Sequence, residues 1–417
     1  MRLGGYFLSG LLALSAGLAM AGDNWPQFRG PTADGKSDST GLPVTFSETE
    51  NVRWKTDVPG KAWSSPVVWN GNIWLTNALP DGKELYAVCI DFATGKVKQN
   101  IKVFDIAKPQ YCIEKNSYAS STPVIEEGRF YAHYGAHGTA CIDTASGATL
   151  WTRQDLECNH HRAPASSPII YQNLLILTFD GFDLQYVVAL DKNTGKTVWK
   201  QDRNIKYGSD NGDIKKAYAT PAVINVNGQT QLVNPSAETA ISYNPLTGEE
   251  LWRVNCGGMN VSCLPLFGNG LVYMTTAAGG FQLYAVKPDG KGDVTGSHVM
   301  WKLTKGVPKQ ASQILLGDLL FMGNEQGVLT CVDAKNGEVV WQNRVDGKAV
   351  FTASPIYGDG KIYFLSEEGV VAVVAAEREY KLLATNKLAD GFMASPAVSG
   401  KSLLLRTKTA LYRVEAK

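Results

Sequence analysis

The chain lacks an excess of charge of either sign. Its 417 residues carry 40 Lys and Arg against 39 Asp and Glu, so the formal net charge is +1. A balance this close to zero leaves no electrostatic footprint for nucleic acid or for an anionic membrane surface. We therefore expect no nucleic-acid partner.

The chain also lacks an apolar N-terminal run long enough for a membrane span. Residues 7–18 are apolar, but a helical span needs roughly 20 such residues. Arg2 supplies a positive charge before this run, and Ala19-Met20-Ala21 forms a small-x-small cleavage site after it. The pattern predicts a signal peptide over residues 1–21 and no transmembrane segment after its removal. An uncleaved N-terminal anchor is the alternative.

Cysteine is missing from the first part of the chain. No cysteine precedes Cys89, so the sequence does not support a lipid-anchored lipoprotein. With the predicted export signal, this indicates a periplasmic or secreted protein.

An internal repeat is what the sequence does contain. A Ser-Pro or Thr-Pro step, or a variant of it, opens an apolar run eight times at intervals of roughly 45 residues, and a period of that size means a repeat architecture. The copies are Ser65-Pro66, Thr122-Pro123, Ser167-Pro168, Thr220-Pro221, Leu264-Pro265, Ser312-Gln313, Ser354-Pro355 and Ser395-Pro396.

A second signature recurs within these units. An aliphatic run ends in Asp or Asn, a turn with Gly follows, and most copies then have Trp. In such a turn the Asp or Asn side chain bonds to the backbone and Gly takes the positive φ, so each copy predicts a hairpin. With two further strand-like runs upstream, each unit has the four strands of a propeller blade. The copies are residues 87–96, 140–151, 188–199, 241–252 and 330–341.

The two ends of the repeat array complement each other. The unit that begins at Pro396 is too short to hold its fourth strand, while residues 51–57, with Trp54, precede the first proline step. Pairing the first strand with the last unit closes the ring and removes exposed sheet edges. The sequence therefore predicts an all-β fold, a closed eight-bladed β-propeller of four-stranded antiparallel blades. Residues 51–417 would form this single domain, after a lead segment at residues 22–50.

One motif carries a family resemblance. The Ala-x-Asp-x-x-x-Gly-x-x-x-Trp pattern, complete at residues 189–199, resembles the tryptophan-docking motif of the pyrroloquinoline quinone (PQQ) type propellers. That group includes quinoprotein dehydrogenases and a non-enzymatic propeller of outer-membrane assembly. The run Trp25-Pro26-Gln27-Phe28-Arg29-Gly30-Pro31 also looks like the start of secreted PQQ-like propellers. The resemblance implies the fold, because the docking motif is a structural device between blades.

The resemblance to the dehydrogenases implies PQQ and calcium as cofactors. Those enzymes commonly stack PQQ against a ring made by adjacent cysteines, and this chain has no Cys-Cys dipeptide. It has no haem-binding Cys-x-x-Cys-His motif either, and the Glu, Asn and Asp set that holds calcium does not map onto it. The cofactors therefore stay unknown, with PQQ and calcium possible but not favoured.

The seven cysteines divide into two groups. Cys89, Cys141 and Cys331 lie two residues before a turn Asp, at the register of Ala189, and are predicted to be buried core thiols. Cys112, Cys158, Cys256 and Cys263 remain. An even remainder in an exported protein suggests disulfides, here 112 with 158 and 256 with 263. Free buried thiols are the alternative.

Three consecutive connections between blades are expanded, at residues 104–117, 155–165 and 202–217. Long loops on a rigid scaffold often hold binding groups. His160 and His161 are candidate acids or bases here, with Glu114 and Asp180 as carboxylates and Arg162 and Lys215 as anchors for an anion or hydroxyl. The histidines could instead bind a metal with Glu114 or Asp180, or hydrogen-bond within the loop. The run from Asp210 to Asp213 has the composition of a calcium loop, but lacks the ligand spacing of one.

A set of aromatic side chains just before the proline steps is expected on the same face: Trp63, Tyr118, Tyr218, Phe351 and Phe392. Such rings could stack on a sugar or a planar cofactor. They could equally close the funnel mouth and pack against the prolines.

Two functions remain open. The first is an exported scaffold that binds a protein or glycan partner through the funnel face and long loops. The second is a periplasmic oxidoreductase or other carbohydrate-active enzyme under the three long connections, although no Gly-x-Ser-x-Gly or His-Glu-x-x-His motif occurs. The enzyme alternative requires His160 or His161, together with Glu114 and Arg162, to converge on one cavity.

Overall fold

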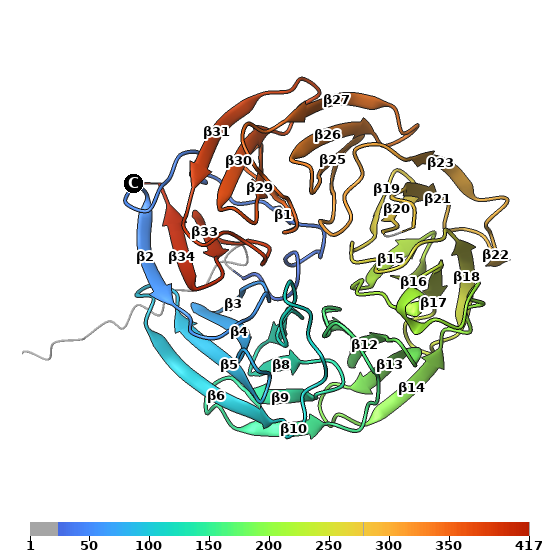
Figure 1. The fold of residues 1–417 in the computed structure, drawn as a ribbon, viewed down its shortest axis with the longest axis horizontal. Coiled ribbons are helices and arrows are strands. Elements are labelled where there is room, and N and C mark those ends of the chain that lie inside the picture. Colours follow the sequence, from blue (N-terminus) through green and yellow to red (C-terminus); the bar gives the residue numbers. More distant parts are fainter. Residues whose placement is uncertain (1–23, 278, 417) are drawn as a thin grey trace, which may run out of the picture.

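A computed structural model describes residues 24–277 and 279–416. The predicted signal peptide at residues 1–21 therefore lies outside the described residues. Eight antiparallel sheets surround a central axis in a closed ring (Figure 1). The predicted fold class, an all-β eight-bladed propeller with four-stranded blades, is confirmed.

Blades 1 to 4 follow in chain order from the innermost strand outward. Their strands are, for blade 1, β3 (Val67–Trp69), β4 (Asn72–Ala78), β5 (Glu84–Asp91) and β6 (Val97–Asp105); for blade 2, β7 (Val124–Glu126), β8 (Arg129–His133), β9 (Thr139–Asp143) and β10 (Thr149–Arg153); for blade 3, β11 (Ile169–Tyr171), β12 (Leu174–Asp180), β13 (Gln185–Asp191) and β14 (Thr197–Asp202); and for blade 4, β15 (Ala222–Val226), β16 (Gln229–Pro235), β17 (Thr239–Tyr243) and β18 (Glu250–Asn255). A 3₁₀ turn, η2 (Gly212–Lys215), lies between blades 3 and 4.

Blades 5 to 8 complete the ring. Their strands are, for blade 5, β19 (Leu266–Gly268), β20 (Leu271–Thr275), β21 (Leu283–Val286) and β23 (Val299–Leu303); for blade 6, β24 (Ile314–Leu316), β25 (Leu319–Gly323), β26 (Val328–Asp333) and β27 (Val339–Arg344); for blade 7, β28 (Ile356–Gly358), β29 (Lys361–Leu365), β30 (Val370–Ala375) and β31 (Leu382–Lys387); and for blade 8, β32 (Ala397–Ser399), β33 (Ser402–Arg406), β34 (Ala410–Glu415) and β2 (Val52–Asp57). Two short parallel strands extend blades 4 and 7, namely β22 (Gly292–Asp293) beside β18 and β1 (Lys36–Ser37) beside β28.

The seam of the ring lies in blade 8. The N-terminal β2 pairs antiparallel with the C-terminal β34, and Trp54 stands opposite Arg413. Figure 1 shows β2 at the outer edge of this blade, next to the end of the chain. The first strand thus completes the last blade, as the lengths of the two end units predict.

Tryptophans of the outer strands dock blades 2, 3, 5, 6 and 8 onto the next blade, whereas the outer strands β6 and β31 of blades 1 and 7 contain no tryptophan. The indole N–H of Trp54 donates to Phe92 O, that of Trp151 to Lys192 O and that of Trp199 to Pro245 O, at 2.9 to 3.1 Å. The face of each of these indole rings packs against the turn glycine of the next blade. A Cβ on Gly95, for example, would meet the Trp54 ring at 2.6 Å. The spacing of Gly and Trp in the repeat therefore reflects contact between neighbouring blades. Trp301 docks in the same way onto Ala334 O, although β22 interrupts its motif.

The lead segment crosses the axis of the ring (Figure 1). Trp25 exchanges two backbone hydrogen bonds with Val68 in blade 1, and Pro26 O accepts the amide of Ile125 in blade 2. Arg29 then reaches blades 6 and 7, where its buried guanidinium donates to the carbonyls of Gln313 and Pro355. The motif from Trp25 to Pro31 thus forms a strap across one end of the central channel.

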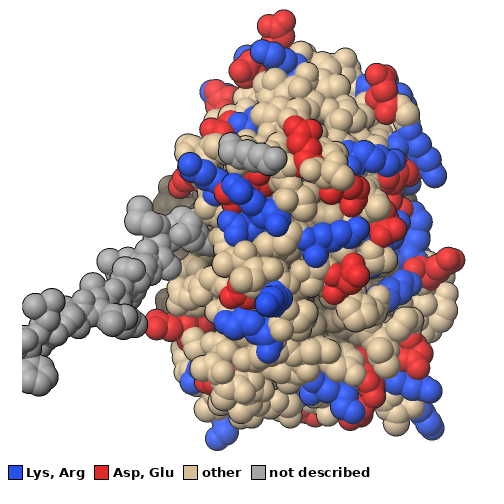
Figure 2. Space-filling view, turned by 90° about the vertical axis from the view of Figure 1, so that its left-hand side faces the viewer, with Lys and Arg blue, Asp and Glu red and all other residues tan. Residues whose placement is uncertain are grey.

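Charges of both signs alternate over the flank of the disc. Figure 2 shows Lys and Arg interspersed with Asp and Glu over this side, without an extended region of one sign. This distribution agrees with the balanced composition. None of the helical segments within the described residues is long and apolar enough to pass through a bilayer.

The predicted disulfides are wrong. All seven cysteines are free, and Cys89, Cys141 and Cys331 are buried core thiols as expected. The Cys158 sulfur lies 3.7 Å from Leu184 O, whereas Cys112 contacts Ile113 O in its own loop. Cys263 donates to Ala311 O at 3.2 Å. A disulfide needs Cβ atoms about 3.8 Å apart and facing each other, and these side chains have other neighbours.

Candidate functional site

The repeated hydroxyl residues form hydrogen bonds from blade to blade around the axis. In six of the eight copies, the backbone amide of the residue before the proline (or before Gln313) donates to the hydroxyl at the same position in the next blade, at 2.9 to 3.0 Å. We call the six accepting side chains the hydroxyl ring: Thr122, Ser167, Thr220, Ser312, Ser354 and Ser395. Leu264 interrupts the sequence of bonds because it offers no hydroxyl to Thr220. The Ser-Pro and Thr-Pro steps therefore couple neighbouring blades at the channel.

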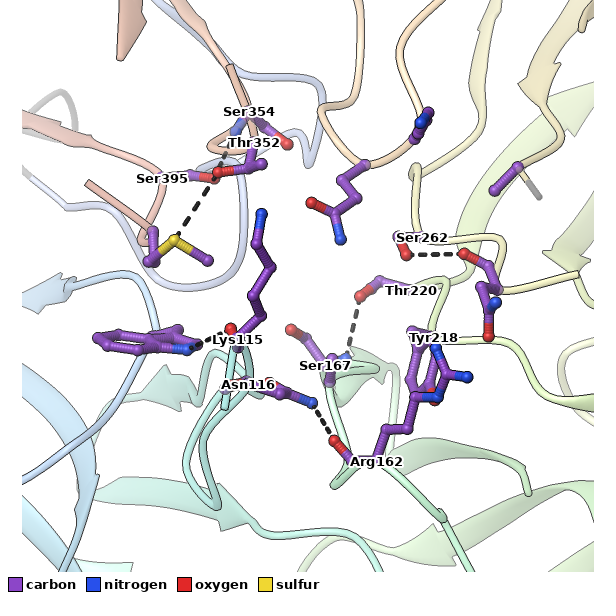
Figure 3. Close-up of a pocket in the computed structure, with 18 of the residues that line it drawn as sticks. Lys115, Asn116, Arg162, Ser167, Tyr218, Thr220, Ser262, Thr352, Ser354 and Ser395 are labelled. Atoms are coloured by element: carbon purple, nitrogen blue, oxygen red, sulfur yellow. Dashed lines mark hydrogen bonds between the residues drawn. The ribbon is translucent and has the colours of Figure 1, made fainter. Parts of the chain in front are cut away.

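A cavity of about 630 Å³ occupies the channel above this ring. Hydroxyl side chains, three cations, one carboxylate and several apolar side chains line it (Figure 3). Phe28 of the lead segment contributes to the lining, so the strap closes one end of the cavity. The lining residues used in the argument below are Phe28, Trp63, Lys115, Asn116, Arg162, Tyr218, Lys309 and Glu325.

The long connections join one another beside this cavity. Asn116 donates to the carbonyls of Arg162 and Ala163, at 2.8 and 3.1 Å. Arg162 in turn binds Asp213 at 3.2 Å, and Lys216 binds both Asp213 and Asn260. The three expanded segments therefore form one continuous layer, which we call the cap, over blades 1 to 3.

The predicted catalytic residues do not meet in this cavity. Arg162 lines the cavity, but the His160 side chain is buried within the cap. Glu114 is exposed, and its backbone carbonyl accepts a hydrogen bond from Lys61. Asp180 is fully buried in an ion pair with Arg203, at 2.6 Å. Burial raises the pKa of Asp180, and the Arg203 charge opposes that change. The enzyme alternative required convergence, which this geometry does not provide.

His161 and Lys215 lie at the outer side of the cap. The His161 side chain is partly exposed, with its ring 3.7 Å from Asp213. Lys215 Nζ lies over the ring of Tyr207 at 5.6 Å. The two adjacent histidines thus face different surroundings, because the chain turns at His161, which has a φ of 60°.

Three buried histidines form a cluster where the cap meets blade 2. His160 Nε2 accepts the Ala136 amide at 3.0 Å, and His137 Nε2 accepts the Gln110 amide at 3.1 Å. His133 bonds to Thr139 at 2.8 Å, and its ring meets Phe179 edge-on. Burial lowers the pKa of His133 and of His160 to about 3, and it also lowers the pKa of His137. The cluster is therefore neutral at ordinary pH.

The predicted aromatic set divides in two. Trp63 and Tyr218 line the cavity. Tyr118, Phe351 and Phe392 are buried in the core between blades. Trp63 and Tyr218 are thus placed to contact a ligand, while the other three serve packing.

The lining does not match the cofactors that the family resemblance implies. Glu325 is its one carboxylate, and no group of three His, Cys, Asp or Glu suited to a metal occurs in the described part of the chain. Asp213, in the segment with calcium-loop composition, already binds Lys216, Arg162 and His161. The residues present therefore do not build a PQQ and calcium site of the dehydrogenase kind.

Several lining residues were missed from the sequence. Lys115 belongs to an expanded connection but has no motif, and Lys309 and Glu325 come from blades without long loops. Phe28 lies in the lead segment, far along the chain from the cap. The proline steps were the one available signal, because six of the eight copies place a hydroxyl side chain in the cavity lining.

Eight blades, five of them docked onto the next by a tryptophan and the last closed by β2, define a PQQ-like β-propeller, as the motifs predict. Residues 183–417 match the family model described as outer membrane protein assembly factor BamB. The chain belongs to this family.

Two curated relatives carry the same description. The protein of Legionella pneumophila (strain Paris) is 21% identical over 257 residues, which cover 60% of this chain and 52% of the relative. That of Yersinia pestis is 23% identical over 200 residues, which cover 44% of this chain and 47% of the relative. The chain thus spans about half the length of the curated relatives it matches.

Solved structures share the fold. BamB from Moraxella catarrhalis has a TM-score of 0.61 at 13% identity, covering 87% of this chain and 98% of that one. A europium-containing methanol dehydrogenase has a TM-score of 0.65 at 11% identity, covering 93% and 90%. Quinohemoprotein alcohol dehydrogenase from Comamonas testosteroni reaches 0.66 at 10% identity, covering 96% and 82%. Both a named assembly factor and named dehydrogenases thus have this architecture, so the fold does not select between them.

Proposed function

We propose that this chain is an exported scaffold in the periplasm or outside the cell, and that its cap and funnel face bind a protein partner. On this proposal residues 51–417 act as one domain and residues 22–50 as its lead segment. Family membership supports the role, because the curated relatives are named as outer membrane protein assembly factors. The partner of this chain would then belong to such an assembly.

The observation that carries the proposal is a group of aromatic rings on and beside the cap, of which Tyr111 is exposed and His161 and Phe182 are partly exposed. Tyr111 is 64% exposed, and its ring centre lies 6.2 Å from that of His161. The His161 ring is in turn 5.0 Å from Phe182, and Leu184 nearby in the chain is 42% exposed. Exposed apolar groups together on a firm support are typical of protein-binding surfaces, where aromatic side chains provide much of the affinity.

The loops that carry these rings are held in place by hydrogen bonds. Gln110, next to Tyr111, donates to Cys158 O at 2.8 Å and accepts the amide of His160 at 3.1 Å. Phe182 donates its amide to Asn159 O at 2.7 Å. The rings therefore need little rearrangement on binding, which lowers the entropic cost of association.

A photo-crosslinking experiment tests the docking surface. A photoreactive phenylalanine analogue would replace Tyr111 in the full chain, expressed in its native host. We expect adducts with outer-membrane assembly proteins, identified by mass spectrometry. The matched control places the analogue at Met300, which is 49% exposed on the rim of blade 5. No adduct at position 111, or the same adducts at 300, would contradict the proposal.

A glycan is the second candidate partner. Trp63 and Tyr218 line the funnel cavity together with hydroxyl side chains. Flat rings beside hydrogen-bonding groups are suited to the faces and hydroxyls of a sugar, and the volume lies within the range of small-molecule sites.

A further inference from the structure

Hydrogen-bond donors without protein acceptors surround the funnel cavity. Thr122, Ser167, Thr220, Ser354 and Ser395 line it, and each uses its oxygen to accept a neighbouring amide. Among the described residues, none of these five hydroxyls donates a hydrogen bond to another protein group. Their protons are thus available to a ligand that is rich in oxygen atoms.

Positive charge accompanies these donors. Lys115, Arg162 and Lys309 line the cavity, and Figure 3 shows Lys115 extending toward its middle. Lys115 has a distant carboxylate neighbour, Glu367 at 3.5 Å, and its side chain is 73% exposed. Exposed pairs of this kind contribute little, so Lys115 remains free to bind an anion.

One acceptor in the lining also lacks a partner. Glu325 Oε1 accepts the Lys309 amide at 2.9 Å, whereas its Oε2 is buried without a hydrogen-bond donor. A buried oxygen in this state is costly unless a ligand donates to it. The complementary ligand therefore carries hydroxyl donors as well as anionic acceptors.

The walls and floor restrict the ligand further. Trp63 and Tyr218 offer flat rings, and Phe28 of the strap lies at the closed end. The strap crosses the channel from blade 1 to blades 6 and 7, so a ligand enters from the cap side. A compact molecule fits such a cup better than a continuous strand that must pass through it.

We propose that the funnel cavity binds an acidic sugar, a ring that bears both hydroxyls and a carboxylate. The hydroxyl ring would donate to its oxygens, Lys115 and Arg162 would hold its carboxylate, and Glu325 would accept from one of its hydroxyls. A fully ionised simple dicarboxylate has no donor for Glu325. This inference rests on the glycan partner in the proposed function and does not involve the exposed rings of the cap.

Titration calorimetry on the full mature chain tests the inference with digalacturonate as the probe and maltose as its neutral counterpart. We expect digalacturonate to bind and maltose to bind at least about tenfold more weakly, because charge-assisted hydrogen bonds are the stronger ones. Lys115→Gln should weaken digalacturonate binding about tenfold. Lys108→Gln is the matched control, since Lys108 is exposed in the same connection and outside the cavity lining.

Two further variants test the hydrogen bonds. Glu325→Gln keeps the shape of the side chain but removes the charged acceptor, so binding should weaken several-fold. Thr220→Val removes one donor, and Thr220→Ser should restore binding. Circular dichroism and thermal unfolding would establish that each variant is folded.

Three results would overturn the inference. The first is no heat of binding for digalacturonate at millimolar concentration with folded wild-type protein. The second is equal weakening by Lys108→Gln and Lys115→Gln, which would indicate non-specific attraction. The third is tighter binding of an acidic peptide, tetraglutamate, with the same dependence on Lys115. Crosslinking at position 111 is measured without sugar, so a failure here leaves the protein-docking test intact.

Discussion

The capped sector and the opposite sector of the ring have the same strands but different interiors. Blades 2 to 4 bury charged or histidine side chains, namely His133, His137, His160, Asp180, Arg203 and Lys216. In the described part of blades 5 to 7 and their connections, the buried polar side chains are neutral, such as Ser312, Gln313 and Ser354. The repeat thus determines the scaffold in both sectors. The capped sector adds buried ionisable groups, which come both from its expanded connections and from β8, β12 and the turn after β8, and such groups need well-placed hydrogen-bond partners.

The largest expected difference between the sectors comes from the ion pair of blade 3. Asp180→Ala would leave the Arg203 guanidinium buried and without its carboxylate, although Asn234 still accepts from it at 3.0 Å. We expect the free energy of unfolding to fall by about 3–5 kcal/mol, measured by chemical denaturation. Asp318→Ala in blade 6 is the control, because its pair with Lys335 is exposed and should contribute about 1 kcal/mol or less. Equal losses in the two variants would remove the distinction between the sectors.

The second-largest expected effect is a loss of folding stability at acidic pH, which arises in the capped sector. The pKa of His133 and His160 is about 3 in the folded chain, below the ordinary 6.5, so the unfolded chain takes up protons that the folded chain does not. Stability is therefore full above pH 6.5 and falls as the pH drops toward 3, by about 1.4 kcal/mol per pH unit for each histidine. Denaturation midpoints between pH 7 and 4 would measure this slope.

A pair of variants locates the acid effect. His160→Gln should make the slope shallower by the contribution of one histidine, and His133→Gln should do so by a similar amount. The interpretation fails if neither variant makes the slope shallower.

The smallest expected effect concerns the contact that both sectors share. Ser354→Ala removes the hydroxyl that accepts the Ser312 amide, and an unpaired buried amide costs about 1–2 kcal/mol. Ser65→Ala is the matched control, because no ring amide among the described residues donates to Ser65. A shift in thermal midpoint for Ser354→Ala no larger than for Ser65→Ala would show that the hydroxyl ring contributes little to stability.

The fold could be predicted because its signals are local and repeated. The Gly and Trp of the repeat, such as Gly195 and Trp199, recur at fixed spacing since several blades make the same contact with a neighbour. The seam at Trp54 followed from the length of the last unit. The disulfides could not be predicted, because whether Cys112 faces Cys158 depends on how two loops cross, and spacing along the chain does not contain that information.

The sequence predicted which sector of the ring contains the candidate site, but only some of the side chains that line it. The expanded connections indicated the cap, and Arg162, Trp63 and Tyr218 do line the cavity. His160 and Asp180 turned inward instead, because burial among Phe179 and Arg203 satisfied them there. Polarity in a loop sequence does not distinguish a side chain that faces a ligand from one that bonds within the protein.

The amino-acid sequence by itself determined the eight blades, their docking tryptophans and the closure of the ring, because each rests on a short-range pattern repeated along the chain. The tertiary structure decided which side chains reach the axis. Phe28, Lys115 and Glu325 meet there from the strap, the cap and blade 6, segments that approach one another only when the ring has closed.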